Sequence, residues 1–282
     1  MISVAMATYN GEKYLKDQLQ SIIRQDMKVD EIVIVDDNSS DETYRILEEF
    51  KELFENEYSI VLKRNEKNIG YTANFFKAIS LTKGQYIFLC DQDDVWDHEK
   101  VAYMISAIKK MHASVMSSYF TVIDENGDET KKRYDIPRYV EKCPAELNKI
   151  PMATLMMGNV SQGCTYCFTA EVRDIYLQIH YDELIHDYQI MLIGAALDSA
   201  FFTKKKLIQY RIHSNNSVGF QEKRTLKNVD FIIKHREPRV VTLLRRMKRV
   251  TSVKDYHKCI LIQYLRIPIW GAIIHRFLKK EM

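Results

Sequence analysis

A regular alternation of strand-like and helix-like segments over the first 111 residues constrains the fold more than any other feature of the sequence. Short apolar or β-branched runs predict strands over residues 2–7, 31–35, 59–62 and 86–90. Apolar residues at helical spacing predict helices over residues 12–25, 41–54, 71–81 and 98–111. This order is typical of an α/β fold in which helices flank both faces of a mainly parallel sheet. Crossovers between parallel strands are right-handed, so the carboxyl ends of the strands share one edge, where ligands of such sheets bind.

The second part of the chain is less regular. Its pattern predicts strands over residues 115–123 and 163–170, helices over 171–180 and 183–197, and a strand or hairpin over 200–211. The length of 282 residues and the apolar content of 46 % allow one large domain with an appendage.

Polar side chains follow each of the four strands predicted in the first part. These clusters are Thr8 to Gly11, Asp36 to Ser39, Asn65 with Asn68 to Gly70, and Asp91 to Asp94. Loops are generally polar, and that would explain any one cluster. Four clusters in succession, two of them with paired acids, indicate a ligand site at this edge of the sheet.

The stretch YIFLCDQDDVW ends a strand-like run with three acids. Five uncharged residues, from Tyr86 to Cys90, precede Asp91, Asp93 and Asp94. Crowded carboxylates repel one another and lose solvation. A cation such as Mg2+ or Mn2+ prefers oxygen ligands, often keeps substrate phosphates in its shell, and offsets that repulsion. The sequence therefore predicts a metal and a diphosphate at the end of the fourth strand.

Several motifs, taken in this order, resemble the inverting family 2 glycosyltransferases, and among them the bacterial rhamnosyltransferase-type members that build surface polysaccharides. The motifs are ATYNGEKYL, IVIVDDNSSDET, the Asn68-x-Gly70 turn, CDQDDVW, IHDY and YRIHSNNSVG. The resemblance covers residues 1–220 and implies a GT-A fold, a nucleotide-sugar donor and a divalent cation, Mn2+ or Mg2+. It divides this domain into a nucleotide-binding half, residues 1–112, and an acceptor and catalytic half, residues 113–220.

The resemblance also implies roles for individual residues of the donor site. The segment Ala7-Thr8-Tyr9 would lie along the nucleotide base, Asp37 would bond that base, and the turn from Asn68 to Gly70 would lie near the donor. Asp93 would ligate the metal directly, with Asp91 at the ribose or at a metal-bound water and Gln92 in the same loop. His213 would complete the metal or diphosphate site, whereas Asp36 is interpreted as a structural residue that caps the turn after it.

Asp187 matches the catalytic base of that family. One carboxylate can accept the proton of an acceptor hydroxyl, and a single base without a second nucleophile implies inversion. Asp187 also opens an apolar helix, so stabilisation of the helix dipole is the alternative interpretation. The candidate acceptor contacts are Trp96, His186 and Tyr188, with burial in the core as the alternative for Trp96. Related rhamnosyltransferases often carry two tryptophans where this chain has Tyr188-Gln189, which leaves the acceptor and the sugar open.

Residues 221–282 form a basic extension of an acidic body. The extension has 16 Lys and Arg against 5 Asp and Glu, whereas residues 1–220 have 25 against 33. Such a split indicates an anionic partner. Residues 239–249 and 259–277 mix apolar and basic side chains, and Tyr264 and Trp270 suit a lipid headgroup boundary. We therefore expect an anionic membrane surface, with packing on the body or a homodimer contact as the alternatives, and we expect no nucleic-acid partner because no recognition motif is present.

The remaining signals concern location and cysteines. The sequence shows no signal-peptide pattern and no run of about 18 apolar residues that would span a bilayer, so we expect a cytoplasmic protein on the inner face of the membrane. Five cysteines do not predict a disulfide framework, and the pair Cys164-x-x-Cys167 is interpreted as core packing.

The predicted function is a metal-dependent inverting transfer of a sugar, with rhamnose from dTDP-rhamnose as the first choice, to a glycan or lipid-linked acceptor. One alternative is a nucleotidyltransferase that makes nucleotide sugars. That reaction would require a glycine-rich basic loop after the first strand, which TYNGEKYL lacks. The other alternative is a non-catalytic glycan or membrane scaffold that keeps the same fold.

Overall fold

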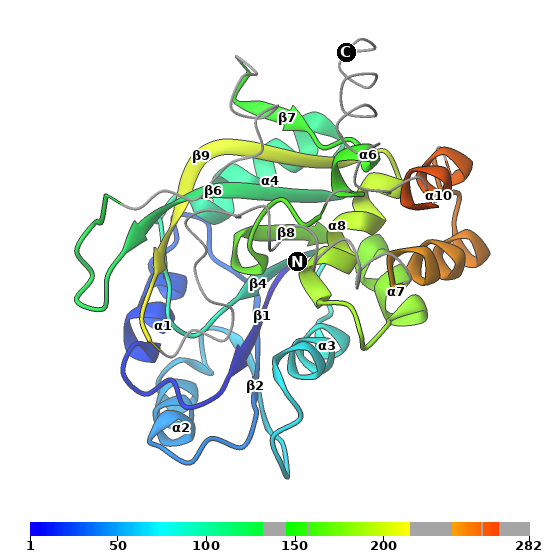
Figure 1. The fold of residues 1–282 in the computed structure, drawn as a ribbon. Helices are drawn as coiled ribbons and strands as arrows, with labels where there is room; N and C mark the ends of the chain where they lie inside the picture. Colours follow the sequence, from blue (N-terminus) through cyan, green and yellow to red (C-terminus); the bar gives the residue numbers. More distant parts are fainter. Residues whose placement is uncertain (132–144, 157, 215–238, 255, 265–282) are drawn as a thin grey trace.

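The computed structural model describes residues 1–131, 145–156, 158–214, 239–254 and 256–264. One nine-stranded sheet runs through these residues in the order β3-β2-β1-β4-β8-β6-β9-β5, with β7 paired to β9 (Figure 1). The strands are β1 (Ile2–Thr8), β2 (Glu31–Asp36), β3 (Ser59–Arg64), β4 (Tyr86–Cys90), β5 (Val95–Trp96), β6 (Val115–Ile123), β7 (Leu147–Lys149), β8 (Tyr166–Thr169) and β9 (Ala200–Arg211).

The first half of the sheet is parallel, as predicted. β1 pairs in parallel with both β2 and β4, and β2 pairs in parallel with β3. Each of these strands is joined to the next by a helix, namely α1 (Leu15–Ile23), α2 (Thr43–Phe54) and α3 (Tyr71–Leu81). The helix α4 (Lys100–Met111) follows β4 and the short strand β5. The carboxyl ends of β1, β2 and β4 therefore meet at one edge, where the polar clusters lie.

The second half of the sheet is mixed. β8 is antiparallel to both β4 and β6, whereas β6 and β9 are parallel. β9 is one long strand whose end turns toward the acids, because Val95 and Trp96 of β5 pair with Gln209 and Ile208. The hairpin alternative for residues 200–211 is therefore wrong, and β5 and β7 are strands that the sequence pattern did not indicate. Two-residue and three-residue strands are too short to show a period.

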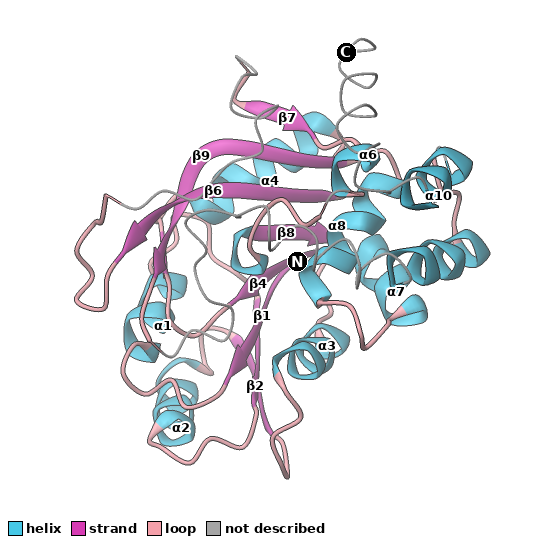
Figure 2. Cartoon of the chain, viewed as in Figure 1, coloured by secondary structure: helices cyan, strands magenta, loops and turns pink. Residues whose placement is uncertain are grey.

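Helices cover both faces of the sheet (Figure 2). On one face, α1, α2 and α4 pack against alternate side chains of β1, β2 and β4, in a core that includes Leu19, Leu47 and Met104. On the other face, α3 packs with α7 (Ala170–Ile179) and α8 (His186–Ala196). Every residue of α8 is buried, so this helix lies inside the protein rather than on its surface.

Part of the basic extension packs on the body. A helix over residues 239–250 buries Val240, Leu243, Leu244 and Met247 in the same core cluster as α7 and α8. It is followed by α10 (Tyr256–Tyr264), and in the described ranges no helix is both long and apolar enough to cross a membrane. Apart from Val250, which is exposed, the large apolar side chains of residues 239–250 are thus buried within the protein. The predicted interfacial residue Trp270 and the side chain of Tyr264 lie outside the described part of the chain.

Candidate active site

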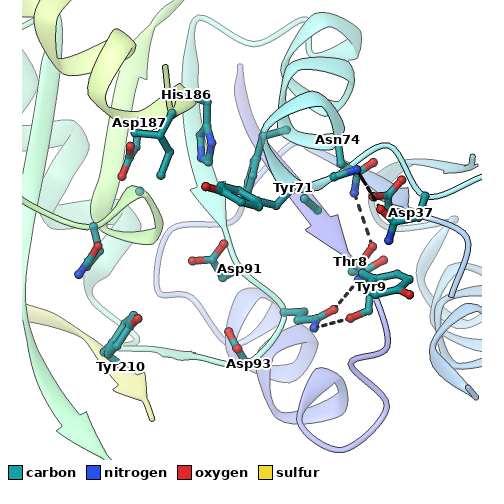
Figure 3. A pocket seen from close by; sticks show the side chains of 18 residues that line it. Thr8, Tyr9, Asp37, Tyr71, Asn74, Asp91, Asp93, His186, Asp187 and Tyr210 are labelled. Atoms are coloured by element: carbon teal, nitrogen blue, oxygen red, sulfur yellow. Dashed lines mark hydrogen bonds between the residues drawn. The ribbon is translucent and has the colours of Figure 1, made fainter. Parts of the chain in front are cut away.

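A cavity of about 310 Å³ opens where β1, β2 and β4 end and α8 begins (Figure 3). Its lining includes most of the predicted site residues, which are Ala7, Thr8, Tyr9, Asp37, Asn68, Gly70, Asp91, Gln92, Asp93, His186 and Asp187. It also includes residues that the sequence analysis did not name, which are Tyr71, Asn74, Phe75, Gln162, Gly163, Ile185 and Tyr210. The strand ends thus gather into one site, as the parallel order predicts.

The loop after β1 is held by Gln92. The backbone N–H of Tyr9 donates to Gln92 Oε1 at 2.7 Å, and Gln92 Nε2 donates to the carbonyl of Tyr9 at 2.9 Å (Figure 3). Gly11 makes room for this pairing, since a Cβ at that position would lie 2.4 Å from the Gln92 side chain. The Gln92 amide therefore positions the Tyr9 backbone at the cavity mouth.

Asp37 orders the turn that precedes α3. Its carboxylate accepts hydrogen bonds from the backbone N–H groups of Ile69 and Gly70, at 2.9 and 2.8 Å, and from the Asn65 side chain at 2.8 Å. Gly70 adopts a φ of 85°, a region that glycine enters without strain. Asp36 is structural, as predicted, because it accepts the Ser39 N–H at 2.9 Å in the turn that follows β2.

The three acids after β4 do not all line the cavity. Asp91 and Asp93 line the cavity, whereas Asp94 is buried beneath it and accepts the backbone N–H of Arg211 at 3.0 Å. Burial raises the pKa of Asp91 well above its usual range, and the charges of Asp94, Asp93 and Asp187 raise it further. Burial and the charge of Asp93 raise the pKa of Asp94 to about 7. Burial and neighbouring acids thus both favour the protonated form of Asp91 and Asp94.

His213 comes to this cluster from the end of β9. Its Nε2 lies 2.9 Å from Asp93 Oδ2, and its ring packs 4.8 Å from the ring of Tyr14, measured between centroids. Two carboxylates and one imidazole are ligands that Mn2+ or Mg2+ accepts, and a divalent cation would offset the repulsion that raises the pKa of Asp91. The carboxylates of Asp91 and Asp93, with the imidazole of His213 beside Asp93, are therefore of the types that would hold the implied metal.

Among the described residues, the possible ligand atoms that lie within 4.8 Å of one another belong to Asp91, Asp94 and Cys164. Burial raises the pKa of Cys164 well above its usual range, and the charges of Asp94 and Asp91 raise it further. A protonated thiol is a poor ligand for a hard cation. Cys164 and Cys167 both lie in the core cluster on the α1 face, in agreement with their interpretation as packing residues.

Asp187 lies in the first turn of α8 and faces the same cavity as Asp91 (Figure 3). Gly163 permits this approach, because a Cβ there would lie 3.2 Å from Asp187 Cβ and 3.3 Å from His186 Nε2. His186 stacks on Phe75 with ring centroids 4.2 Å apart, and burial lowers its pKa to about 3. The imidazole beside Asp187 is therefore neutral at physiological pH.

Two of the predicted acceptor contacts do not fit the structure. Trp96 is 4 % exposed and packs against Phe88 in the core, with the Lys100 ammonium 3.9 Å from its ring. Tyr188 is 1 % exposed, and its O–H donates to the carbonyl of Leu155. Neither side chain lines the cavity, so among the three candidates only His186 reaches it. Trp96 follows the acids in sequence, but β5 pairing turns it to the opposite face of the sheet.

Apart from Ile185, which directly precedes His186 at the start of α8, the lining residues that were not predicted fall into two groups. Tyr71, Asn74 and Phe75 share one face of α3 because they are three and four positions apart, so helical spacing after the Asn68 turn could have indicated them. Gln162, Gly163 and Tyr210 carry no such local signal. They reach the cavity because β8 and β9 join the sheet beside β4 and β6.

Comparisons with known proteins agree with this geometry. The profile of glycosyl transferase family 2 matches residues 3–171. The dTDP-rhamnosyl transferase RfbG of Shigella flexneri is 27 % identical over 261 residues, which cover 89 % of this chain and 83 % of that protein. The putative teichuronic acid biosynthesis glycosyltransferase TuaG of Bacillus subtilis is 26 % identical over 53 % of this chain and 58 % of its own length.

Solved structures show the same fold. TarS 1-349 of S. aureus, solved in complex with UDP-GlcNAc, superposes with a TM-score of 0.63 at 18 % identity, covering 93 % of this chain and 70 % of TarS. The mannosyltransferase PcManGT of Pyrobaculum calidifontis, solved with GDP-Man and Mn2+, gives a TM-score of 0.56 at 16 % identity, covering 93 % of this chain and 68 % of that one.

The sheet order and the helices on both faces define a GT-A type fold. The chain belongs to glycosyl transferase family 2. This assignment favours glycosyl transfer over the nucleotidyltransferase and scaffold alternatives, and an inverting reaction is consistent with the family.

Proposed function

We propose that this protein transfers a sugar from a nucleotide-diphosphate donor, with inversion at the anomeric carbon and with dependence on a divalent cation. The observation that carries the proposal is the meeting of Asp91, Asp93 and Asp187 in one cavity, from the end of β4 and the start of α8. The donor would lie along Ala7 to Tyr9, under the turn that Asp37 holds. The acceptor would enter beside Asp187.

Asp187 is the proposed base. Its carboxylate would accept the proton of the acceptor hydroxyl as the acceptor oxygen attacks the anomeric carbon and the diphosphate leaves. Mn2+ or Mg2+, held by Asp91, Asp93 and His213, would supply positive charge for the leaving diphosphate. His186, neutral and stacked on Phe75, would orient groups at this wall without competing for the proton.

The particular sugar is a finer proposal. RfbG is named a dTDP-rhamnosyl transferase and spans most of this chain, so rhamnose from dTDP-rhamnose is the first donor to test. TuaG is named for teichuronic acid biosynthesis, a cell-surface polymer, which supports a role in bacterial surface polysaccharide synthesis with a glycan or lipid-linked acceptor. From the positive charge of the extension we further propose contact with the inner face of the cell membrane, with a homodimer contact as the alternative.

Thermal unfolding with UDP, dTDP and GDP, each with and without Mn2+, tests the donor site first. A ligand that binds only the folded state stabilises it by mass action, by about 2.7 kcal/mol at one hundred times its Kd. We expect one nucleotide to stabilise the protein in a metal-dependent manner, and Asp93→Ala to abolish the effect. If no nucleotide at millimolar concentration stabilises the folded protein, the proposal is wrong. A product with the anomeric configuration of the donor would exclude inversion.

A further inference from the structure

The segment that leads into the Asp187 turn is anchored from inside the protein. Residues 180–185 connect α7 to α8, and Ile185 at their end lines the cavity. Gln189, which is fully buried, accepts the Tyr181 N–H at 3.0 Å and donates to the Tyr181 and Leu184 carbonyls at 2.9 and 2.5 Å. Gln189 thus ties Tyr181 and Leu184 to the buried helix α8.

The basic extension contacts the beginning of the same segment. Arg246 donates to the carbonyls of Ile179, at 3.3 Å, and of His180, where α7 ends. Its guanidinium carbon also lies 4.8 Å from the centre of the Tyr181 ring, and Arg239 pairs with Glu183 at 3.4 Å. A guanidinium satisfies several acceptors at once, and a cation is favourable at the carboxyl end of a helix, where carbonyls lack partners.

The same extension also meets the far end of α8. The backbone N–H of Lys254 donates to the carbonyl of Ala196 at 3.2 Å, and Lys254 Nζ lies 2.7 Å from Asp198 Oδ2. Between these two attachments, Leu243, Leu244 and Met247 are fully buried against the cluster that contains α8. The extension therefore contacts the segment that precedes α8 and also the carboxyl end of α8.

We propose that the helix over residues 239–250 positions Asp187 for catalysis, and that Arg246 is its principal positioning residue. The inference rests on the proposed role of Asp187 as the base. A displacement of a reacting group by about 1 Å can lower the rate about 100-fold. Contacts that fix residues 180–185, which lead into the turn with Asp187, therefore affect turnover. The nucleotide lies at the strand ends, where Arg246 makes no described contact. Arg239, Arg246 and Lys254, which belong to the basic extension, are thus in contact with the body of the protein.

Steady-state kinetics of Arg246→Ala with the full-length protein tests the proposal. We expect kcat to fall about 10-fold to 100-fold. The donor KM should stay within about threefold of wild type, and nucleotide with Mn2+ should still raise the melting temperature as in wild type. Arg246→Lys should recover part of the loss. The control is Arg249→Ala, an exposed arginine of the same helix, which should leave kcat unchanged.

A double variant separates positioning from general structure. If Arg246 acts through Asp187, Arg246→Ala should slow the Asp187→Asn variant little further. Should Arg246→Ala fail to fold, Arg239→Ala removes the weaker pair and takes its place. An unchanged kcat in the folded variant, or equal losses of kcat and of nucleotide binding, would overturn the inference. Full activity of Asp187→Asn would instead overturn the proposed base, which is a distinguishable result.

Discussion

His213 Nε2 lies 2.9 Å from Asp93 Oδ2, although 120 positions separate the two residues in the chain. Arg211 holds the pair in place, because its backbone N–H donates to Asp94 Oδ1 at 3.0 Å and its Nε donates to the Asp93 carbonyl at 2.9 Å. The end of β9 is thus locked onto the loop after β4. The proposed metal site depends on this junction, because His213 follows β9 whereas Asp91 and Asp93 follow β4.

Replacement of His213 should weaken the metal site without unfolding the protein. We expect His213→Ala to lower the apparent Mn2+ affinity, measured in the presence of nucleotide, by about 10-fold to 100-fold. Titration calorimetry with Mn2+ measures this directly. His98→Ala is a matched control, since His98 pairs with Asp26 on the surface. An unchanged Mn2+ affinity in His213→Ala would exclude His213 from the ligand set.

Removal of the proposed base should affect turnover and not donor binding. We expect Asp187→Asn to reduce kcat by about 100-fold to 10,000-fold, because the amide cannot accept the proton. Nucleotide binding with Mn2+ should stay near that of wild type, and Asp128→Asn, an exposed acid, should behave as wild type in both assays. A variant with wild-type kcat would contradict the assignment.

The fit between Gly11 and Gln92 should be needed for donor binding. In Gly11→Ala the new Cβ would meet the Gln92 side chain at 2.4 Å, which forces apart the two hydrogen bonds to Tyr9. We expect the donor KM to rise about 10-fold, the equivalent of roughly 1.4 kcal/mol. Gln92→Ala should raise the KM similarly, and the double variant should be no worse than Gln92→Ala alone. Additive losses would show that the clash is not the cause.

His186 should make the folded state sensitive to acid. Its pKa is about 3 in the folded protein and about 6.5 when unfolded, so the unfolded state binds the proton more tightly. The stability that the neutral imidazole provides is complete above about pH 6.5 and declines as pH falls from there toward 3. His186→Phe, which keeps a ring against Phe75, should lose less stability between pH 7 and 4 than wild type. Urea unfolding at both pH values measures the difference, and parallel losses would contradict it.

Much of the fold could be predicted because its signals are local. The strands β1 to β4 and the helices between them differ from the predicted bounds by at most a few residues, since buried parallel strands are continuous apolar runs and helices show their period. The edge of the sheet at which polar groups gather follows from right-handed crossovers. Asp37, Asp91 and Asp93 could therefore be placed at this edge before any coordinates, whereas Asp187 was named through the resemblance to family 2 glycosyltransferases, and all four line the cavity.

Other features depend on pairing between distant segments. Trp96 stands beside the acids in sequence, yet the pairing of β5 with β9 buries it in the opposite core. Gln92 lies in the predicted donor loop, but its amide is used on the Tyr9 backbone. No local pattern specifies which distant strand a two-residue segment will pair with, or which carbonyl a side chain will reach.

The sequence by itself determined the order of strands and helices, the edge of the sheet that carries the site and the carboxylates found there, because periodicity and chain direction are properties of neighbouring residues. Only the tertiary structure decided that His213 meets Asp93, that Trp96 and Tyr188 are buried, and that residues 239–250 pack beside α8. Those contacts join residues far apart in the chain, and their geometry is set by how the whole core packs.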